Sequence, residues 1–258
     1  MIKKTFGCLY APVVQRPRMR PSHGRDPSSN LGGGVFKILK MKKRERIKKV
    51  MENLEKYFQY KERTTLNRMR RKPEAFKIMV SCLLSLRTQD RNTEKASKKL
   101  FAVADTPEKI LKLSDKKLEK LIYSSGHYKK KAKTIKHVSK IVLDKHNGKV
   151  PDTREELLKI KGIGPKTANI VLAFAYGKSV LPIDTHCHRI PNRLGWIKTK
   201  TPEQTEKKLE KILPKKYWRE FNAIFVVFGQ TICQPISPFC SKCPIREYCP
   251  RIGVTRSR

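Results

Sequence analysis

The chain has 258 residues, enough for one large domain or two smaller ones, and its formal net charge is +38. No apolar run has signal-peptide length near the N-terminus or approaches the ~18 residues of a membrane-spanning helix, so we expect a soluble, intracellular protein without membrane contact. The 60 Lys and Arg against 22 Asp and Glu indicate a polyanionic partner such as nucleic acid. The alternative is a lysine-rich solvated surface, as in proteins of thermophiles.

The first 44 residues differ in composition from the rest of the chain. They contain four prolines, a run of three glycines at 32–34, and 11 Lys or Arg against one Asp. Such a segment has little to bury, so we predict a basic, disordered N-terminal extension over residues 1–44. Met41 opens a basic helical stretch and is a second candidate for the first residue of the protein.

Apolar residues recur every three or four positions through most of the remaining chain. After Pro73, for example, Phe76, Met79 and Leu83 share one predicted helix face. Strand signals are sparse, because the stretch 180–183 is short and contains a proline. The predicted fold class is therefore all-α. Further helices are predicted over 93–102, 107–113, 115–123, 128–146, 153–160, 165–176, 184–194, 202–212 and 217–230.

A short glycine turn joins two of these helices, over Lys161-Gly-Ile-Gly-Pro-Lys166. Thr153 and Glu156 have the spacing of a capping box at the start of the first helix. Gly162 and Gly164 are expected to permit a tight turn with unusual backbone angles, and the proline after them suits the first position of the second helix. The turn presents backbone N–H groups at a helix N-terminus, which suits a DNA phosphate, although a purely structural turn can have the same sequence.

Lys166 is predicted in the first turn of the second helix, where the helix dipole disfavours a protonated amine. A lysine that loses its proton there can act as a nucleophile and form a Schiff base, whereas an ordinary lysine would bind phosphate. Further along the chain, Asp184 lies in an apolar stretch before a predicted helix, so we expect it to cap that helix. Capping and catalysis are compatible roles for one carboxylate.

Four of the seven cysteines are gathered near the C-terminus, with the spacing Cys233-x6-Cys240-x2-Cys243-x5-Cys249. Four such thiolates can hold one iron–sulfur cluster. Zinc is the alternative, but zinc sites favour paired Cys-x2–4-Cys knuckles, and this spacing contains one such pair. In a reducing compartment, metal binding is more common for such cysteines than disulfide formation. Cys82 and Cys187 are interpreted as ordinary buried thiols, and Cys8 is left over.

Three motifs in order along the chain resemble one family. The run Leu158–Asn169, the triplet Asp184–His186 and the 6-2-5 cysteine spacing resemble endonuclease III, a DNA glycosylase/AP lyase of the helix–hairpin–helix superfamily. The resemblance covers about residues 47–252 and leaves the N-terminal extension outside.

The resemblance implies two helical domains that flank a DNA-binding cleft. A continuous six-helix domain with the helix–hairpin–helix motif would span 68–178. A discontinuous domain would combine 45–67 with 179–258 and carry a [4Fe-4S] cluster on Cys233, Cys240, Cys243 and Cys249. The cluster would be structural and would order a loop that contacts DNA.

The resemblance also implies the reaction and its residues. Lys166 matches the nucleophile, whose amine attacks C1′ of the damaged nucleotide, displaces the base and leaves an imine, after which β-elimination cuts the strand on the 3′ side. Asp184 matches the acid that helps to activate the nucleophile and stabilises positive charge on the sugar. The implied partner is double-stranded DNA with oxidised pyrimidines or abasic sites. A monomer would act on it during base excision repair, inside the cell and on DNA, which in a prokaryote means the cytoplasm or nucleoid.

Two residues of this sequence, Arg87 and His127, match positions at which loops of the family contact the opened duplex. In the stretch Ser85–Asp90, Arg87 replaces a glutamine that fills the gap left by the flipped base, which leaves the preferred opposite base open. His127 stands where the family has a residue that wedges into the duplex, and its alternative is a plain exposed loop residue. Arg87, His127, Gly162 and Gly164 are therefore predicted to contact DNA.

The loop 234–239 departs from the family more strongly, because it lacks the basic residues that contact phosphate there. We expect Lys242 and Arg246 to supply this contact instead.

Two other functions share part of this pattern. A mismatch glycosylase without lyase activity has the cluster and the Asp but another residue at the position of Lys166. A non-enzymatic damage-binding protein needs neither Lys166 nor Asp184. The presence of both residues favours the bifunctional enzyme, while no motif names the residues that select the damaged base.

Overall fold

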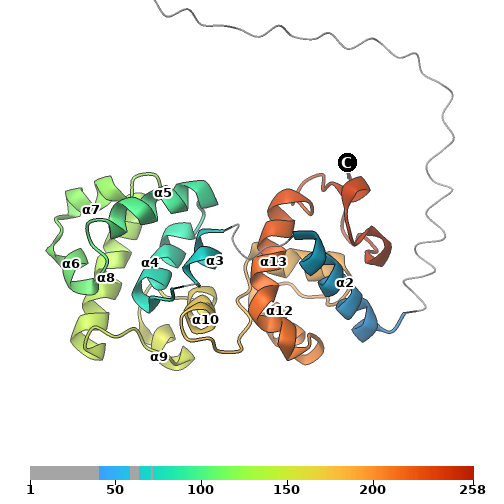
Figure 1. Ribbon diagram of the computed structural model, residues 1–258, viewed down its shortest axis with the longest axis horizontal. Helices are drawn as coiled ribbons and strands as arrows, with labels where there is room; N and C mark the ends of the chain where they lie inside the picture. Colours follow the sequence, from blue (N-terminus) through green and yellow to red (C-terminus); the bar gives the residue numbers. More distant parts are fainter. Residues whose placement is uncertain (1–40, 59–63, 71) are drawn as a thin grey trace, which may run out of the picture.

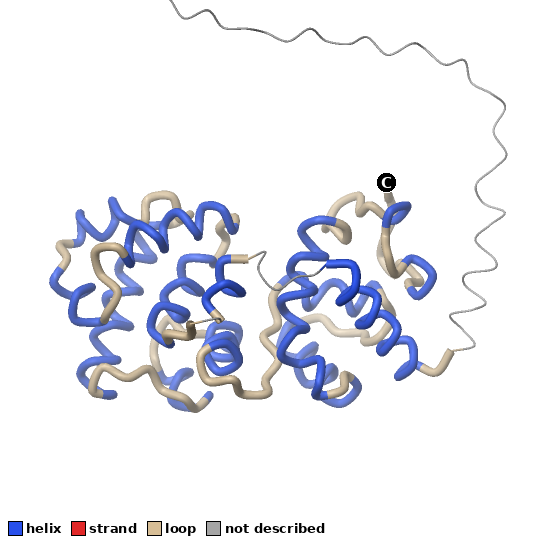
Figure 2. Tube along the Cα trace, viewed as in Figure 1, coloured by secondary structure: helices blue, strands red, loops and turns tan. Residues whose placement is uncertain are grey.

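The computed structural model describes residues 41–58, 64–70 and 72–258. Figure 1 shows two helical lobes side by side, and Figure 2 shows helices joined by loops, without a strand in these residues. The predicted all-α class is confirmed. The predicted N-terminal extension lies outside the described residues up to position 40, and its last two residues already belong to helix α2 (Lys43–Phe58).

The first lobe contains the helices from α3 to α10. The span 68–178, for which the family resemblance implies six helices, holds seven complete ones among the described residues, with α6 and α7 separate as the sequence pattern predicts. Leu113 is the C-cap of α6, and Ser114 is the N-cap of α7, where its hydroxyl accepts a hydrogen bond from the backbone N–H of Lys117 at 3.3 Å. The helices are α3 (Thr65–Met69), α4 (Ala75–Ser85), α5 (Asp90–Phe101), α6 (Pro107–Lys112), α7 (Asp115–Leu121), α8 (Tyr128–His146), α9 (Arg154–Lys159) and α10 (Pro165–Phe174).

The second lobe combines both ends of the described chain. Helix α2 packs on α13, although the whole first lobe lies between them in the sequence (Figure 1). The other elements of this lobe are α11 (Thr185–Arg193), α12 (Pro202–Ile212), α13 (Trp218–Thr231) and the short 3-10 helices η2 (Lys215–Tyr217), η3 (Cys240–Lys242) and η4 (Arg246–Tyr248).

Each lobe has its own hydrophobic core. In the first lobe, α4, α5 and α8 bury side chains such as Met79, Leu100 and Ile135. In the second lobe, α2 and α13 bury side chains such as Leu54 and Phe221. Full burial of one such side chain contributes about 1.5–3 kcal/mol to the free energy of folding. Each core therefore stabilises its own lobe.

Local sequence signals explain several helix limits. The predicted capping pair is in contact: Thr153 Oγ1 accepts from the backbone N–H of Glu156 at 3.4 Å and donates to its carboxylate at 2.9 Å. A cap of this kind contributes about 1 kcal/mol. The helices predicted over 128–146 and 202–212 have these limits in the structure. Helix α5 begins at Asp90, three residues earlier than predicted, because its first turn is polar and shows no apolar period.

Two polar bridges join the lobes. In the first, Arg154 of α9 donates to both carboxylate oxygens of Glu206 on α12, and Asn169 of α10 donates to the same carboxylate at 2.8 Å. Glu206 is 6% exposed. In the second, Arg70 donates two hydrogen bonds to the carboxylate of Glu220 on α13, at 2.8 and 3.0 Å. Bidentate pairs fix direction as well as distance, so these bridges set how the lobes face each other.

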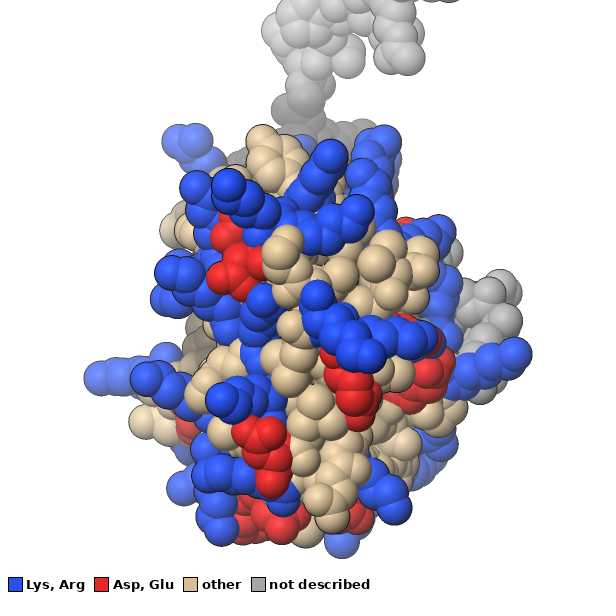
Figure 3. Space-filling view, turned by 90° about the vertical axis from the view of Figure 1, so that its left-hand side faces the viewer, with Lys and Arg blue, Asp and Glu red and all other residues tan. Residues whose placement is uncertain are grey.

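Basic side chains are abundant on one end face of the first lobe (Figure 3). Figure 3 shows the end of this lobe that lies at the left in Figure 1, where Lys and Arg are spread over most of the face and smaller groups of Asp and Glu lie between them. Of the helices that the structure describes, none combines the length and the apolar character needed to cross a membrane.

Candidate active site

A cleft of about 990 Å³ lies between the two lobes. The first lobe contributes the end of α4, the start of α8, the glycine hairpin and α10, and the second lobe contributes parts of α11, α12 and α13. The structure brings together six of the predicted site residues as lining of this cleft: Arg87, His127, Gly162, Gly164, Lys166 and Asp184. The four C-terminal cysteines, Lys242 and Arg246 lie outside its lining.

The glycine hairpin needs glycine at one of its two positions. Gly162 has a φ of +103°, and a Cβ there would lie 2.7 Å from Thr134 Cγ2, so a side chain would be both strained and crowded. Gly164 has a φ of −97° with open space on its Cβ side. The expectation of an unusual backbone angle at Gly164 is therefore wrong. The absence of a side chain at Gly164 leaves the N-terminus of α10 uncovered.

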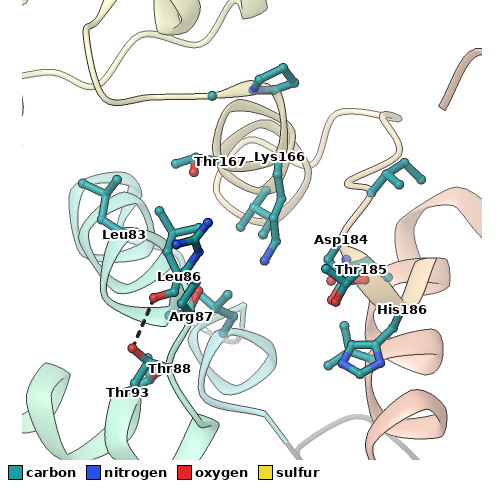
Figure 4. A pocket seen from close by; sticks show the side chains of 18 of the residues that line it. Leu83, Leu86, Arg87, Thr88, Thr93, Lys166, Thr167, Asp184, Thr185 and His186 are labelled. Carbon is teal, nitrogen blue, oxygen red and sulfur yellow. Dashed lines mark hydrogen bonds between the residues drawn. The ribbon is translucent and has the colours of Figure 1, made fainter. Parts of the chain in front are cut away.

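Lys166 is the second residue of α10, and its half-buried side chain extends into the cleft. Figure 4 shows it pointing from α10 into the space between Arg87 on one side and Asp184 on the other. Lys166 also acts electrostatically on His186, which lines the opposite side of the cleft. Burial lowers the pKa of His186, and the charges of Arg189 and Lys166 lower it further, against the opposing effect of Asp184.

Asp184 is the N-cap of α11, as predicted. Its Oδ1 accepts a hydrogen bond from the backbone N–H of Cys187 at 2.8 Å, which fixes the carboxylate at the edge of the cleft. This hydrogen bond anchors the Asp184 side chain where the residue lines the cleft.

His186 forms a link that the sequence analysis missed. Arg189 Nη2 lies 3.1 Å from His186 Nδ1 and donates to the carbonyl oxygen of Cys233 at 2.7 Å. A Cβ at Gly229 of α13 would lie 2.1 Å from His186 Nδ1, so glycine is required for the ring to fit. The available signal in the sequence was a glycine inside an otherwise apolar helix, which often marks close packing.

Arg87 and His127 come from two loops that meet at the cleft. Both side chains are exposed, and both residues have left-handed backbone, with φ of +50° and +58°. A Cβ at Gly126 would lie 3.1 Å from the carbonyl oxygen of Arg87, so the two loops are in close contact. Left-handed backbone is uncommon for residues with a side chain and persists where the surrounding structure holds it.

The four C-terminal cysteines line one pocket in the second lobe, and all four are free thiols. Burial, together with repulsion from the neighbouring thiolates, raises the pKa of Cys243 to about 12 and that of Cys249 to about 11. A nearby arginine, Arg193, donates from Nη1 to Cys233 Sγ at 3.5 Å. Among the described residues, no three His, Cys, Asp or Glu side chains converge on a single metal-ion position.

The other cysteines are as predicted where the structure describes them: Cys82 and Cys187 are fully buried, and Cys8 lies outside the described residues.

The positively charged side chain of Arg258 packs on the uncharged loop 234–239. The guanidinium of Arg258 lies over the ring of Phe239, 4.0 Å from its centroid. It also donates to a carbonyl and an amide oxygen of the loop, at 3.0 and 2.9 Å. No motif in the sequence assigns a role to this arginine. The predicted contacts Lys242 and Arg246 are exposed on η3 and η4.

Comparisons with known proteins define the class to which this fold belongs. The family described as HhH-GPD superfamily base excision DNA repair protein matches residues 80–215. The chain is 48% identical over 182 residues to endonuclease III of Thermotoga maritima, covering 70% of this chain and 85% of that protein. It is 41% identical over 182 residues to endonuclease III-like protein 1 of Mus musculus, covering 69% of this chain but 61% of the mouse protein.

Solved structures agree with this class. A trapped covalent endonuclease III–DNA intermediate has a TM-score of 0.73 and 31% identity, over 82% of this chain and 97% of that chain. A non-covalent endonuclease III–DNA complex has a TM-score of 0.71 and 30% identity over the same shares. This chain belongs to the endonuclease III family.

Proposed function

We propose that this protein is a bifunctional DNA glycosylase and AP lyase of base excision repair, acting on double-stranded DNA with oxidised pyrimidines or abasic sites. The observation that carries this proposal is the meeting of Lys166 and Asp184, from different lobes, in one cleft (Figure 4). An amine at a helix start opposite a carboxylate suits nucleophilic chemistry on a sugar. A protein that only binds DNA needs neither group.

Lys166 is the proposed nucleophile. Its Nζ forms a bond to C1′ while the glycosidic bond breaks, and the base leaves with the bonding electrons and gains a proton. Opening of the sugar ring then gives an imine between Nζ and C1′. The imine acidifies the proton on C2′; loss of this proton and departure of the 3′ phosphate oxygen break the strand by β-elimination. Water finally releases the amine.

Asp184 is the proposed electrostatic partner. Its Oδ1 accepts the capping hydrogen bond of α11, and Oδ2 is the oxygen that we propose for the contact with the reacting sugar. A carboxylate at this place stabilises the positive charge that develops on the sugar as the base leaves, and it accepts a proton from the attacking amine.

The remaining residues of the cleft are proposed to hold DNA. The bare N–H groups of the hairpin at Gly162 and Gly164 suit a backbone phosphate. A base inside the duplex is out of reach of Lys166, so the damaged nucleotide must rotate into the cleft. Arg87 and His127, exposed on adjoining loops, are the side chains placed to fill the gap that it leaves.

The two hydrophobic cores support the proposed domain division. The core of α4 to α10 would belong to the domain proposed over 68–178, which α3 joins because Leu66 and Met69 pack on this core, and the core of α2 and α11 to α13 would belong to the discontinuous domain proposed over 45–67 plus 179–258. The cleft between them is where DNA would lie.

We further propose that Cys233, Cys240, Cys243 and Cys249 hold a [4Fe-4S] cluster. Each iron of such a cluster takes one thiolate, so the four sulfurs need to surround a pocket rather than converge on one ion. The cysteines line such a pocket, and the guanidinium of Arg193 donates a hydrogen bond to Cys233 Sγ. The cluster would hold the loops of this lobe in place and take no part in the reaction.

The test of the function is a duplex with a single abasic site, incubated with the full chain with and without sodium borohydride. We expect a strand nick without borohydride and a covalent protein–DNA adduct with it, because borohydride reduces the imine. Base removal from an oxidised-pyrimidine duplex without a nick would point instead to a glycosylase that lacks lyase activity. Tight binding with neither product would point to a damage-binding protein.

The cluster proposal predicts the effect of Cys240→Ala. We expect the purified wild-type protein to contain iron and sulfide and to absorb visible light, and the variant to lose both properties. Zinc has a filled d shell and gives no such absorption. Cys82→Ala, which removes a buried thiol far from this pocket in the sequence, is the control and should keep the absorption. A colourless wild-type protein with zinc would contradict the cluster.

The charged residues around loop 234–239 predict a change in salt dependence. Each lost phosphate contact lowers the slope of log K against log salt by about 0.9 for duplex DNA. We expect the Lys242→Ala, Arg246→Ala double variant to lower the slope by roughly 1–2, and Arg258→Ala to lower it by roughly 1. Lys112→Ala, an exposed lysine on α6, is the matched control. Slopes equal to the control would show that this side of the second lobe does not touch phosphate.

A further inference from the structure

Lys131 is a buried charged residue that the proposed reaction does not use. It lies in the first turn of α8 and is 8% exposed, and burial lowers its pKa to about 8. Its Nζ donates to the carbonyl oxygens of Leu84 and Leu86, each at 2.7 Å. Two hydroxyl oxygens, Thr88 Oγ1 and Ser125 Oγ, lie at 2.8 Å. A buried ammonium is costly unless its donors are satisfied, and here every donor has an acceptor.

The acceptors of Lys131 belong to two separate segments. Leu84, Leu86 and Thr88 lie at the end of α4, and Ser125 lies in the loop before α8. The segments also touch directly, because the backbone N–H of Gly126 donates to Thr88 Oγ1 at 3.1 Å. The ammonium therefore sits at the junction of two loops that are distant in sequence.

These two loops carry the exposed side chains of Arg87 and His127, whose left-handed backbone must be held by its surroundings. The carbonyl groups at the end of a helix lack partners within the helix and carry partial negative charge. Lys131 supplies the missing donors at the end of α4 and at the same time fixes the neighbouring loop. One side chain thus sets the position of both exposed residues.

We propose that Lys131 is a positioning residue that locks the loops of Arg87 and His127 into one preformed wedge, which selects duplexes with a gap at a damaged site. The inference rests on the proposed function, in which these two residues fill the gap left by the flipped nucleotide. Undamaged duplex has no gap, so its binding depends on phosphate contacts and not on the wedge. Lys131 should therefore control discrimination between the two duplexes.

The experiment compares Lys131→Met with Lys129→Met, a matched loss of one exposed lysine in the same turn. Affinity is measured for a duplex with a tetrahydrofuran abasic analogue, which β-elimination does not cleave, and for the same duplex undamaged. We expect Lys131→Met to lower the ratio of the two affinities about tenfold, in the range for a lost charged hydrogen-bond network. Lys129→Met should keep the wild-type ratio.

Thr88→Val keeps the test decisive if Lys131→Met folds poorly. This substitution removes the hydroxyl that joins Lys131 to Gly126 and leaves the ammonium in place. We expect it to lower the ratio in the same direction, by a smaller factor. Thermal unfolding of each variant shows the fraction of folded protein, to which both affinities are corrected.

A pH series separates positioning from a general loss of stability. Lys131 gives up its proton above about pH 8 in the folded chain, so the wedge should weaken and discrimination should fall as pH rises from 7 to 9. The folded pKa lies below the usual value of 10.5, so the folded state binds fewer protons and the contribution of this group to stability rises over the same range. Lost discrimination with unchanged or higher stability would therefore report positioning.

The charged and titratable groups that line the same cleft as Lys131 are Arg87, Asp90, His127, Lys130, Lys166, Asp184, His186, Glu203 and Glu206. An equal decline with pH in Lys131→Met would assign it to one of these groups and overturn the assignment to Lys131. A ratio within twofold of wild type in both Lys131→Met and Thr88→Val would overturn the inference itself. If the wild-type protein neither prefers the analogue duplex nor nicks an abasic site, the proposed function has failed instead.

Discussion

Lys166→Ala is expected to abolish the borohydride-trapped adduct and to slow cleavage at an abasic site by roughly 10³-fold or more, since the nucleophile is lost. The side chain extends from the first turn of α10 into the cleft, where its head group is not part of either hydrophobic core. The fold should therefore survive the substitution. Single-turnover cleavage of an abasic duplex, with adducts resolved by denaturing electrophoresis, measures the effect.

Lys159→Ala is the control, because Lys159 is an exposed lysine at the end of α9 with the same charge. It should keep both the adduct and the nick. Affinity for the uncleavable tetrahydrofuran duplex should change by no more than a few fold in Lys166→Ala, which would separate chemistry from binding. An adduct of wild-type amount in Lys166→Ala would mean that another amine attacks the sugar, and the assignment of the nucleophile would be wrong.

Asp184→Asn is expected to slow removal of an oxidised pyrimidine by roughly 10²–10⁴-fold while the protein stays folded. Asn is as good an N-cap as Asp, so the hydrogen bond to the backbone of Cys187 is retained and only the negative charge is lost. Asp184→Ala should lose the same activity and about 1 kcal/mol of stability in addition. The measurements are single-turnover base release and thermal unfolding.

The pair of variants distinguishes the two roles of this residue. If Asp184→Asn keeps wild-type activity and Asp184→Ala is slow and less stable, then Asp184 serves as a cap alone. Loss of activity in both variants, with loss of stability in the second, supports the two roles together.

Local patterns in the sequence predict much of the fold. The limits of α8 and α12 follow from their apolar period. Thr153 is the N-cap of α9, because its hydroxyl accepts a hydrogen bond from the backbone N–H of Glu156, three residues further along the chain. The cap at Asp184 follows in the same way. These features depend on residues within one turn of each other, so they can be read from neighbours in the chain.

The candidate site is less accessible from the sequence, because its contacts join distant segments. Lys131 is one lysine among many, and no local feature shows that it is buried against the end of α4. The contacts of Arg189 with His186 and with the carbonyl of Cys233 depend on how α11 packs near the cysteine loop. The motifs gave the positions of Lys166 and Asp184, and the structure shows that one cleft contains both, while their roles remain predictions.

The bridges of Arg154 with Glu206 and of Arg70 with Glu220 have a mechanical consequence. They hold the distance between the two lobes constant, so we expect little closure of the lobes around the DNA. The duplex must then supply the deformation. Bending an intact site costs of order 1–6 kcal/mol, and unstacking a base adds to this, with the smallest cost where the base is damaged or missing. A protein with a fixed distance between its lobes would therefore recognise a lesion first by how easily the DNA deforms there, before any side chain contacts the damaged base.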